Sequence, residues 1–416
     1  MKLSKFGEKF TRKAGITELM DDLGAAMASG DMLMLGGGNP AHIPEVQNRF
    51  RQRMEEILDE PQGFETMIGN YDGSRGNAAF IEAMAEMLRE TFGWEIGPEN
   101  IALTNGSQNA FFCLFNLFAG EMPDGSKKKI LFPLTPEYIG YADAGLSDDF
   151  FKAQRPTIEM LDDGLFKYHV DFDALKIGDD IGAICVSRPT NPTGNVLTDE
   201  EILHLDLMAQ DKGIPFIIDN AYGTPFPDII FTDAQPRWNP NTVVCMSLSK
   251  LGLPNFRTGI VIAREEIAAA IGDINGVMHL APGGIGARMA VELVRSGEIM
   301  KMSRDLVQPF YKKKAQDALD LFREELAGIP FHIHKPEGAI FLWLWFPGLP
   351  CTSAQLYERL KARNTLIIPG HHFFPGLESE YWQHKHECIR VTYAQDDAVV
   401  QKGIRVIADE VRKLYG

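Results

Sequence analysis

Four apolar stretches of the chain end in residues that can do chemistry. Lys250 follows the run Thr242–Ser247, and Asp219 closes an earlier run. The runs Asn100–Thr104 and Ile181–Ser187 lead into the segments Asn-Gly-Ser-Gln and Arg-Pro-Thr-Asn-Pro-Thr-Gly-Asn. In a parallel α/β sheet, ligands bind beyond the carboxyl ends of the strands. We therefore expect these groups to meet at one active site.

Each of these features also has an ordinary structural explanation. Gly106-Ser107-Gln108 could be a common strand-to-helix turn, although N–H groups at a helix start also bind phosphate. Asp219 could cap an element, and Tyr222 could be a packing residue. Lys250 is harder to explain, because a lysine beside buried strand ends is usually used or paired. Their joint occurrence favours a functional site.

Together these groups suit pyridoxal 5′-phosphate (PLP). A lysine amine such as that of Lys250 holds the PLP aldehyde as a Schiff base. A carboxylate such as that of Asp219 keeps the pyridine nitrogen protonated. Backbone N–H groups, a hydroxyl and a guanidinium suit the phosphate, and an amide and a phenol suit the ring oxygen. The candidates are Gly106, Ser107, Gln108, Ser247 and Arg257 for the phosphate, and Asn191 and Tyr222 for the ring oxygen.

The elements that must position these residues alternate between apolar runs and helical stretches. Thr198 opens one helix, and Glu201 completes a capping box with it. Continuous apolar runs separated by helices predict a largely parallel sheet covered on both faces. Apolar residues at helical spacing predict a helix up to Phe92, before the first strand. After Gly297, a long helix and several short strands indicate a smaller α+β domain.

Bulk composition limits the classes of protein to consider. The chain has 416 residues and a formal net charge of −16, which argues against nucleic acid and anionic membranes as partners. Its longest apolar runs fall short of the ~18 residues of a membrane helix. The five scattered cysteines and a start without a secretory signal indicate a cytoplasmic protein.

The order of the motifs resembles the fold-type I PLP-dependent aminotransferases. The resemblance rests on Asn-Pro-Thr-Gly from Asn191, on Asp219-x-x-Tyr222, and on Ser-Leu-Ser-Lys ending at Lys250. It implies a mostly parallel seven-stranded sheet in a large PLP-binding domain of residues 46–297. Residues 1–45 and 298–416 would form the small domain.

The resemblance also assigns roles. It implies that Lys250 carries the cofactor and moves the substrate proton, that Asp219 pairs with the pyridine nitrogen, and that Arg390 holds the substrate carboxylate. The further residues implied are Tyr138 stacked on the ring, Asn191 and Tyr222 at the ring oxygen, Ser247 and Arg257 at the phosphate, Asn191 and Gly38 near the substrate, and Tyr71 reaching the phosphate of a neighbouring subunit. The last implies a homodimer. Arg257 lies seven residues after Lys250, whereas aspartate aminotransferases have eight.

Further segments are similar to bacterial members of the family that act on valine and pyruvate. They include Gly-Gly-Gly-Asn-Pro-Ala-His-Ile-Pro-Glu at 36–45 and Lys-Pro-Glu-Gly-Ala-Ile-Phe at 335–341. The expected substrates are L-valine and pyruvate, and the expected products are 3-methyl-2-oxobutanoate and L-alanine. The alternatives are another neutral or aromatic amino acid, or β-elimination by a C–S lyase with the same fold.

Two other classes are disfavoured. An effector domain of a transcription regulator would need a basic helix-turn-helix domain, for which the sequence shows no room. His332 and His334 share one face of a strand, and His371, His372, His384 and His386 cluster later. Such histidines can bind zinc, but no acidic or cysteine partner has suitable spacing, and no metal is expected.

Overall fold

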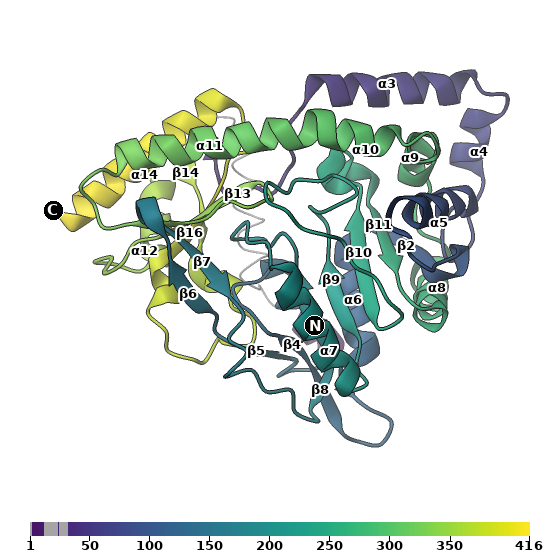
Figure 1. Ribbon diagram of the computed structural model, residues 1–416, viewed down its shortest axis with the longest axis horizontal. Helices are drawn as coiled ribbons and strands as arrows, with labels where there is room; N and C mark the ends of the chain where they lie inside the picture. The colour runs from purple at the N-terminus through teal and green to yellow at the C-terminus, as the bar shows by residue number, and fades with distance from the viewer. Residues whose placement is uncertain (1, 12–23, 25–31) are drawn as a thin grey trace.

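The computed structural model of the protein describes residues 2–11, 24 and 32–416. Its strands form an eight-stranded sheet, a six-stranded sheet and a separate two-stranded pair. Figure 1 shows the large sheet flanked by helices, and the smaller sheet under α11 (Gln308–Glu325) and α14 (Asp397–Tyr415). The predicted fold class, an α/β part with a smaller α+β part, is confirmed.

The large sheet contains the strands that were expected to lead into the site. These strands are β2 (Ile101–Asn105), β3 (Gly120–Glu121), β4 (Lys127–Phe132), β5 (Phe151–Ala153), β8 (Ile181–Ser187), β9 (Phe216–Asp219), β10 (Thr242–Ser247) and β11 (Thr258–Ile262). Their order is β2-β11-β10-β9-β8-β4-β3, with β5 also paired to β4. Only β11 and β3 run antiparallel to their neighbours. The short β3 is added to the seven predicted strands.

Both faces of the large sheet are buried. Along β10, Val243 and Cys245 belong to one apolar cluster, whereas Val244 and Met246 belong to another. This alternation follows the two-residue period of a strand, and it explains why the strand sequences are continuously apolar. The helices over the first cluster are α6 (Ser107–Phe118) and α8 (Glu265–His279), and those over the second are α5 (Ala78–Phe92), α7 (Asp199–Asp211) and α9 (Ile285–Arg295).

The smaller sheet draws on two separated parts of the chain. Its strands are β6 (Thr157–Met160), β7 (Leu165–His169), β12 (His332–His334), β13 (Phe341–Trp345), β15 (Ile368–Pro369) and β16 (Cys388–Thr392). The order is β15-β16-β13-β12-β7-β6. The β6–β7 hairpin comes from within the range 46–297 and pairs in parallel with β12. The division into two domains stays a prediction.

The remaining elements frame the two sheets. β1 (Leu33–Met34) pairs with β14 (Thr365–Leu366), and a π-helical segment, Ser303–Val307, joins α10 to α11. The other α-helices in the described residues are α1 (Lys5–Phe10), α3 (Pro44–Asp59), α4 (Gly63–Gly69), α10 (Glu298–Met302), α12 (Ser353–Lys361) and α13 (His384–Glu387). No helix in the described part of the chain is long and apolar enough to cross a membrane.

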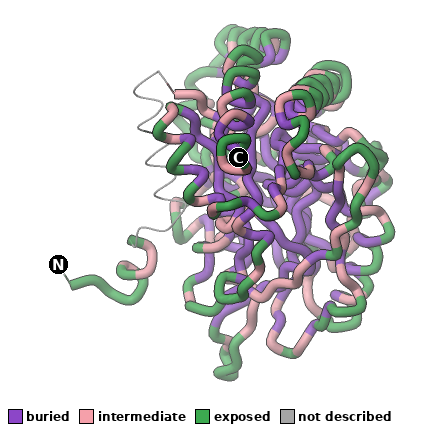
Figure 2. Tube along the Cα trace, turned by 90° about the vertical axis from the view of Figure 1, so that its left-hand side faces the viewer, coloured by how far each residue is buried: buried purple, intermediate pink, exposed green. Residues whose placement is uncertain are grey.

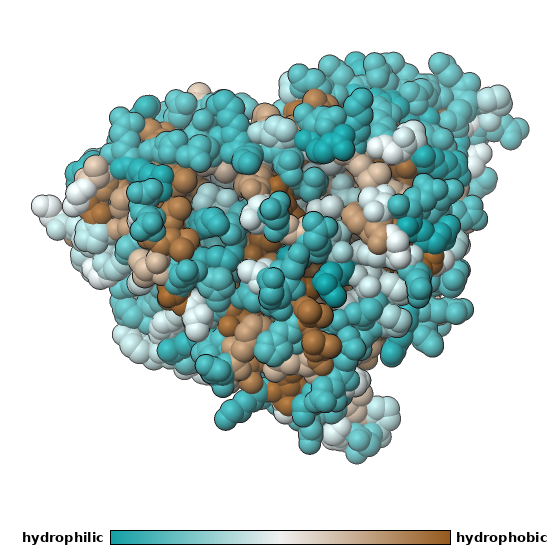
Figure 3. Space-filling model, in the orientation of Figure 1, coloured by the Kyte–Doolittle hydropathy of each residue, from teal (hydrophilic) through white to brown (hydrophobic). Residues whose placement is uncertain are grey.

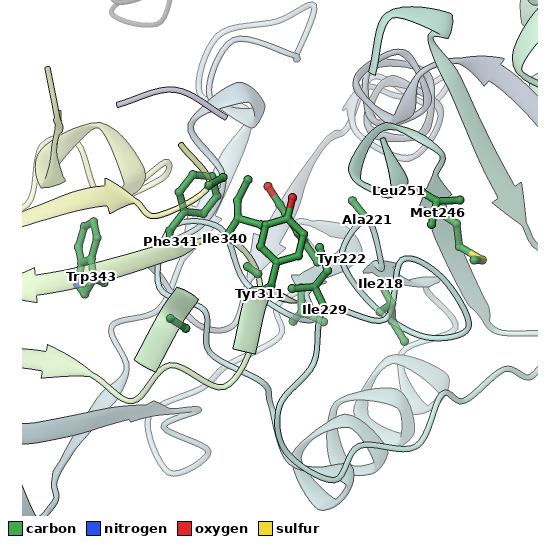
Figure 4. Packing of buried hydrophobic residues seen from close by; sticks show 14 of the residues in the cluster. Ile218, Ala221, Tyr222, Ile229, Met246, Leu251, Tyr311, Ile340, Phe341 and Trp343 are labelled. Carbon is green, nitrogen blue, oxygen red and sulfur yellow. The ribbon is translucent and has the colours of Figure 1, made fainter. Parts of the chain in front are cut away.

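The buried residues run through both sheets and the helices that cover them. Figure 2 shows buried chain running through the interior, with exposed turns around it. In Figure 3 the upper edge of the molecule, formed by α3 and α11, is largely hydrophilic, which is expected for helices that cover a core. Figure 4 shows Tyr222, which lies in the turn after β9, packed beside Tyr311, Ile340 and Phe341. Apolar packing therefore joins the sheet that carries the site to the rest of the molecule.

Candidate active site

The ends of the central strands border one cavity of about 350 Å³. Eleven of the residues singled out in the sequence line it: Gly38, Ser107, Gln108, Tyr138, Asn191, Asp219, Tyr222, Ser247, Lys250, Arg257 and Arg390. The strands that end here are neighbours in the order β11-β10-β9-β8, with β2 beside β11. The parallel sheet therefore brings together groups that are far apart in the sequence.

Lys250 lies in a short 3-10 turn, Ser249–Leu251, directly after β10. Its Nζ donates a hydrogen bond to the Gly38 carbonyl oxygen at 2.6 Å and lies 5.5 Å from the centre of the Tyr222 ring. Burial lowers the pKa of Lys250 to about 8, and the charges of Arg390 and Arg257 act in the same direction. An amine with this pKa has a much larger neutral fraction near physiological pH than an ordinary lysine, and the neutral form is the nucleophile.

Asp219 is the last residue of β9 and has 9% of its surface exposed. Its Oδ1 accepts a hydrogen bond from the Ala221 N–H at 3.0 Å, and its Oδ2 accepts a short one from the Tyr141 hydroxyl. Burial raises the pKa of Asp219 to about 6, although these hydrogen bonds oppose the rise. Asp219 is thus a fixed carboxylate that points into the cavity and has no cation hydrogen-bonded to it among the described residues.

The turn at the start of α6 meets Arg257. Gly106 has φ +84°, and a Cβ added there would lie 2.2 Å from Arg257 Nη2. Gly106 does not line the cavity itself, but it allows the guanidinium to approach the helix start. The Gln108 side chain donates to the Gly140 carbonyl oxygen at 2.7 Å, so the backbone N–H of Gln108 is the group left to bind a phosphate. We call the start of α6 together with Ser247 and Arg257 the phosphate cradle. Ser247 accepts a hydrogen bond from the Ser249 N–H at 3.0 Å.

Arg390 lies on β16 and is 5% exposed. Its Nη1 donates to Asn191 Oδ1 at 2.8 Å and its Nη2 to the Gly36 carbonyl oxygen at 2.7 Å, whereas its buried Nε has no partner. The guanidinium carbon is 4.0 Å from the centre of the Phe341 ring. Burial lowers the pKa of Arg390 to about 10. A buried cation without an acidic partner among the described residues is suited to bind an anion.

The loop that carries Asn191 is fastened to the smaller sheet. Lys167 on β7 forms a buried ion pair with Glu337, and its Nζ also donates to Asn195 Oδ1 at 3.0 Å. Glu337 Oε2 accepts from the Val196 N–H at 3.1 Å. A Cβ on Gly194, which has φ +71°, would lie 2.7 Å from the Gly338 carbonyl oxygen. These contacts fix the backbone that presents the Asn191 amide.

Tyrosines occupy three different environments. Tyr222 is buried and packs against Phe341, with 6.2 Å between ring centres (Figure 4). Tyr138 lines the cavity and makes an edge contact with Tyr141. Tyr71 is 85% exposed and lies outside the cavity. A role for Tyr71 in the site of this same chain is therefore unsupported.

Three buried residues that are linked to Asp219 by hydrogen bonds were not singled out from the sequence. The Tyr141 hydroxyl donates a hydrogen bond to Asp219, and the Ser187 hydroxyl is within hydrogen-bonding distance of both Tyr141 and Glu137. Tyr141 is part of the Pro-Glu-Tyr-Ile-Gly-Tyr segment that also contains Tyr138. The sequence signal that could have identified these residues is the position of Glu137, an acidic residue directly before Tyr138 and close to Tyr141.

The clustered histidines are engaged with protein groups. The Tyr168 N–H donates to His334 Nε2 at 3.1 Å, and the Tyr168 hydroxyl contacts His384 Nε2. His371 stacks beside His372, with 4.0 Å between ring centres. Within the described residues, no group of three or more His, Cys, Asp and Glu side chains is arranged to hold a metal ion.

Comparison with known proteins points to one family. Residues 28–407 match the aminotransferases of class I and II. The valine–pyruvate aminotransferase of Escherichia coli is 54% identical over 415 residues, which cover 100% of this chain and 99% of that protein. A crystal structure of valine–pyruvate aminotransferase from Salmonella typhimurium is 51% identical, with a TM-score of 0.89 and coverage of 96% and 99%. Aspartate aminotransferase of Thermus thermophilus shares the fold at 19% identity, with a TM-score of 0.76 and coverage of 99% and 100%.

Proposed function

The chain belongs to the aminotransferases of class I and II, and from this membership we propose that it transfers the amino group between L-valine and pyruvate. The products are 3-methyl-2-oxobutanoate and L-alanine. The observation that carries this choice of substrates is the 54% identity to the E. coli valine–pyruvate enzyme over the whole chain.

The donor set of the cavity fits PLP, the cofactor of this family. PLP, when bound, supplies an electron sink that makes the substrate Cα–H acidic. Lys250 would hold it covalently through Nζ, and Asp219 would face the pyridine nitrogen. The residues that would hold the rest are Asn191 and Tyr222 at the ring oxygen, Tyr138 at the ring face, and Gly106, Ser107, Gln108, Ser247 and Arg257 at the phosphate.

Arg390 and Lys250 provide the substrate side of the reaction. Arg390 binds the α-carboxylate, because its Nε is buried without a partner and its burial disfavours an uncompensated charge. Asn191 orients the guanidinium through the bond to Nη1, and Gly38 leaves room for the substrate. Lys250 Nζ takes the proton from the substrate Cα, for which a pKa near 8 is suitable.

The described cavity favours a neutral side chain on the substrate. Its charged residues are Asp219, Lys250, Arg257 and Arg390, and each has a task at the cofactor or at the α-carboxylate. Ile139 and Ile368 contribute apolar surface. No described lining residue is left to pair with a charged substrate side chain, which agrees with valine.

The proposed enzyme is a cytoplasmic homodimer. Its exposed apolar residues include a group around α4 and the C-terminal end of α8: Phe64, Ile68, Tyr71, Val277, Met278, Leu280 and Ile285. The Asn275 amide donates to the Ser74 carbonyl oxygen at 2.9 Å, so these segments are neighbours. A second copy covering this surface would bring a Tyr71 toward the other site. All five cysteines, which lie in the described part, are free thiols, as in a reducing compartment.

A screen of amino donors and keto acids tests the substrates. The purified holoenzyme should form alanine from pyruvate with L-valine, at a higher kcat/KM than with L-aspartate. The charged donor should be poor, because its second carboxylate has no partner in the described cavity. Absence of alanine would contradict the substrate assignment. Release of ammonia and pyruvate from cystathionine would instead favour the C–S lyase.

A further inference from the structure

A second buried carboxyl group, that of Glu137, lies behind the Asp219 carboxylate. Glu137 is 1% exposed, and no Lys, Arg or His among the described residues forms an ion pair with it. Its Oε1 lies 2.8 Å from the Ser187 backbone nitrogen, and its Oε2 lies 2.5 Å from Ser187 Oγ. The Glu137 N–H donates to the Phe373 carbonyl oxygen at 2.8 Å, which fixes the backbone of this residue.

Hydroxyl groups connect the two carboxyls. Ser187 Oγ lies 3.4 Å from the Tyr141 hydroxyl oxygen, and the Tyr141 hydroxyl forms the short hydrogen bond to Asp219 Oδ2. Ser187 and Tyr141 are 2% and 0% exposed. The four side chains therefore form one buried line, Glu137–Ser187–Tyr141–Asp219.

Counting protons along this line shows that the two carboxyls are not both ionised. If both carboxyls are ionised, Ser187 donates its one proton to Glu137 and Tyr141 donates its one proton to Asp219. No proton then remains for the contact between Ser187 and Tyr141. If Glu137 is protonated, it donates to Ser187, Ser187 donates to Tyr141, and Tyr141 donates to Asp219. The same contacts are also satisfied if Asp219 is protonated and donates to Tyr141, Tyr141 to Ser187 and Ser187 to Glu137. The contacts therefore require one carboxyl proton on the line, and the charges around its two ends decide where that proton lies.

We propose that Glu137 is a positioning residue that keeps one proton at the far end of this line, so that Asp219 is the sole carboxylate of the pair and faces the cofactor nitrogen. The assignment of Asp219 to that nitrogen rests on the proposed function. The proton on Glu137 does not depend on it, because the contacts require one proton on the line and the cations Lys250, Arg257 and Arg390 lie in the cavity at the Asp219 end.

The surroundings of Glu137 agree with a neutral acid. The titratable groups that face it are Asp219, Tyr138, Tyr141 and Cys185, and none of them is a cation. Burial raises the pKa of Glu137 to about 8, and the charge of Asp219 adds to the rise, although the hydrogen bonds from Ser187 oppose it. Burial raises the pKa of Asp219 only to about 6. At neutral pH the proton therefore belongs on Glu137.

Infrared spectroscopy of the holoenzyme can detect this proton. A buried neutral carboxylic acid has a C=O stretch separate from the carboxylate bands, and it shifts in D₂O. We expect such a band at pH 7, its loss as the pH rises through about 8, and its absence in Glu137→Gln. Glu201→Gln is the matched control: Glu201 is also buried, but the pKa of its carboxyl is lowered, so the band should stay.

Tyr141→Phe tests the line without changing Glu137. Removal of the Tyr141 hydroxyl takes away the acceptor for Ser187, so the C=O band should remain but move in frequency. PLP affinity should fall by about tenfold in Tyr141→Phe, since Asp219 loses a hydrogen bond to a charged group. It should stay within about twofold of wild type in Glu137→Gln, because the glutamine amide can replace the acid as a donor.

Three results would overturn the proposal. They are a wild-type holoenzyme without the band, a band that survives in Glu137→Gln, and a band that Tyr141→Phe leaves unmoved. None of them bears on whether valine is the substrate. Conversely, failure to transaminate valine would leave the infrared result intact, so the two proposals fail separately.

Discussion

At the scale of single residues, the candidate site is dominated by cations. Lys250, Arg257 and Arg390 share the cavity with Asp219 as the one acid among its described lining residues. Each cation disfavours the charge of the others, which is why Arg390 and Arg257 help to lower the pKa of Lys250. The same excess of positive charge suits a ligand with a phosphate and a carboxylate. Electrostatics thus favours both anion binding and a reactive amine.

The lowered pKa of Lys250 gives a pH dependence of covalent labelling. In the cofactor-free protein, the rate at which Lys250 reacts with PLP should rise about tenfold per pH unit below pH 8 and level off above it, since only the neutral amine reacts. Borohydride trapping followed by peptide mapping measures this rate. The labelling rate of an ordinary lysine, whose pKa is 10.5, would keep rising up to that pH, and Lys250→Ala should give no label at this site. A rate that still rises well above pH 9 would contradict the lowered pKa.

At the scale of elements, β11 packs unusually close to the phosphate cradle. A Cβ on Gly259 would lie 2.6 Å from the Gly106 carbonyl carbon and 2.7 Å from the Ser107 nitrogen. Both contacts are with backbone atoms, which cannot move aside as a flexible side chain can. The start of α6 is therefore positioned by the absence of a side chain on the neighbouring strand.

Gly259→Ala should displace the first turn of α6 and weaken PLP binding by roughly tenfold or more, with a loss of stability of about 1–3 kcal/mol from overpacking. Spectroscopic titration of the cofactor-free protein and thermal unfolding measure the two effects. Ile260→Val in the same strand is the control, because it costs a similar ~0.5–1.5 kcal/mol without touching the cradle. Equal PLP affinity in both variants would contradict a positioning role for Gly259.

The sequence predicts correctly those helices and strands whose pattern lies in a few neighbouring residues. The predicted strands Ile181–Ser187 and Thr242–Ser247 coincide with β8 and β10, and the Thr198–Glu201 capping box is present at the start of α7. The hairpin β6–β7 was not predicted, since the surface strand β6 exposes most of its side chains and has no apolar run. Its place in the smaller sheet depends on pairing with β12, far along the chain.

The same distinction applies within the site. Lys250 and Asp219 stand at strand ends, so their convergence follows from topology. The roles of Glu137 and Gly259 were not predicted, because they come from what lies against these residues in three dimensions. Contacts between segments more than about 50 residues apart are not encoded in any local pattern.

At the scale of the whole molecule, the exposed Tyr71 is best explained by a partner. It lies among other exposed apolar side chains near α4 and the C-terminal end of α8, including Ile68 and Leu280. A monomer would leave this surface in water at a cost in solubility. The proposed symmetric dimer would cover this surface on both subunits, and each subunit would then complete the site of the other.

Mixing two defective variants tests this arrangement. Lys250→Ala lacks the amine, and Tyr71→Ala lacks the side chain proposed to act in the partner's site. A dimer of one copy of each has one site in which both residues are wild type. Refolded or exchanged mixtures at equal concentration should therefore recover about a quarter of the wild-type activity per chain at limiting PLP, because half of the dimers are mixed and each has one intact site. Activity that stays at the average of the two separate variants, although native mass spectrometry shows mixed dimers, would place Tyr71 outside the neighbouring site.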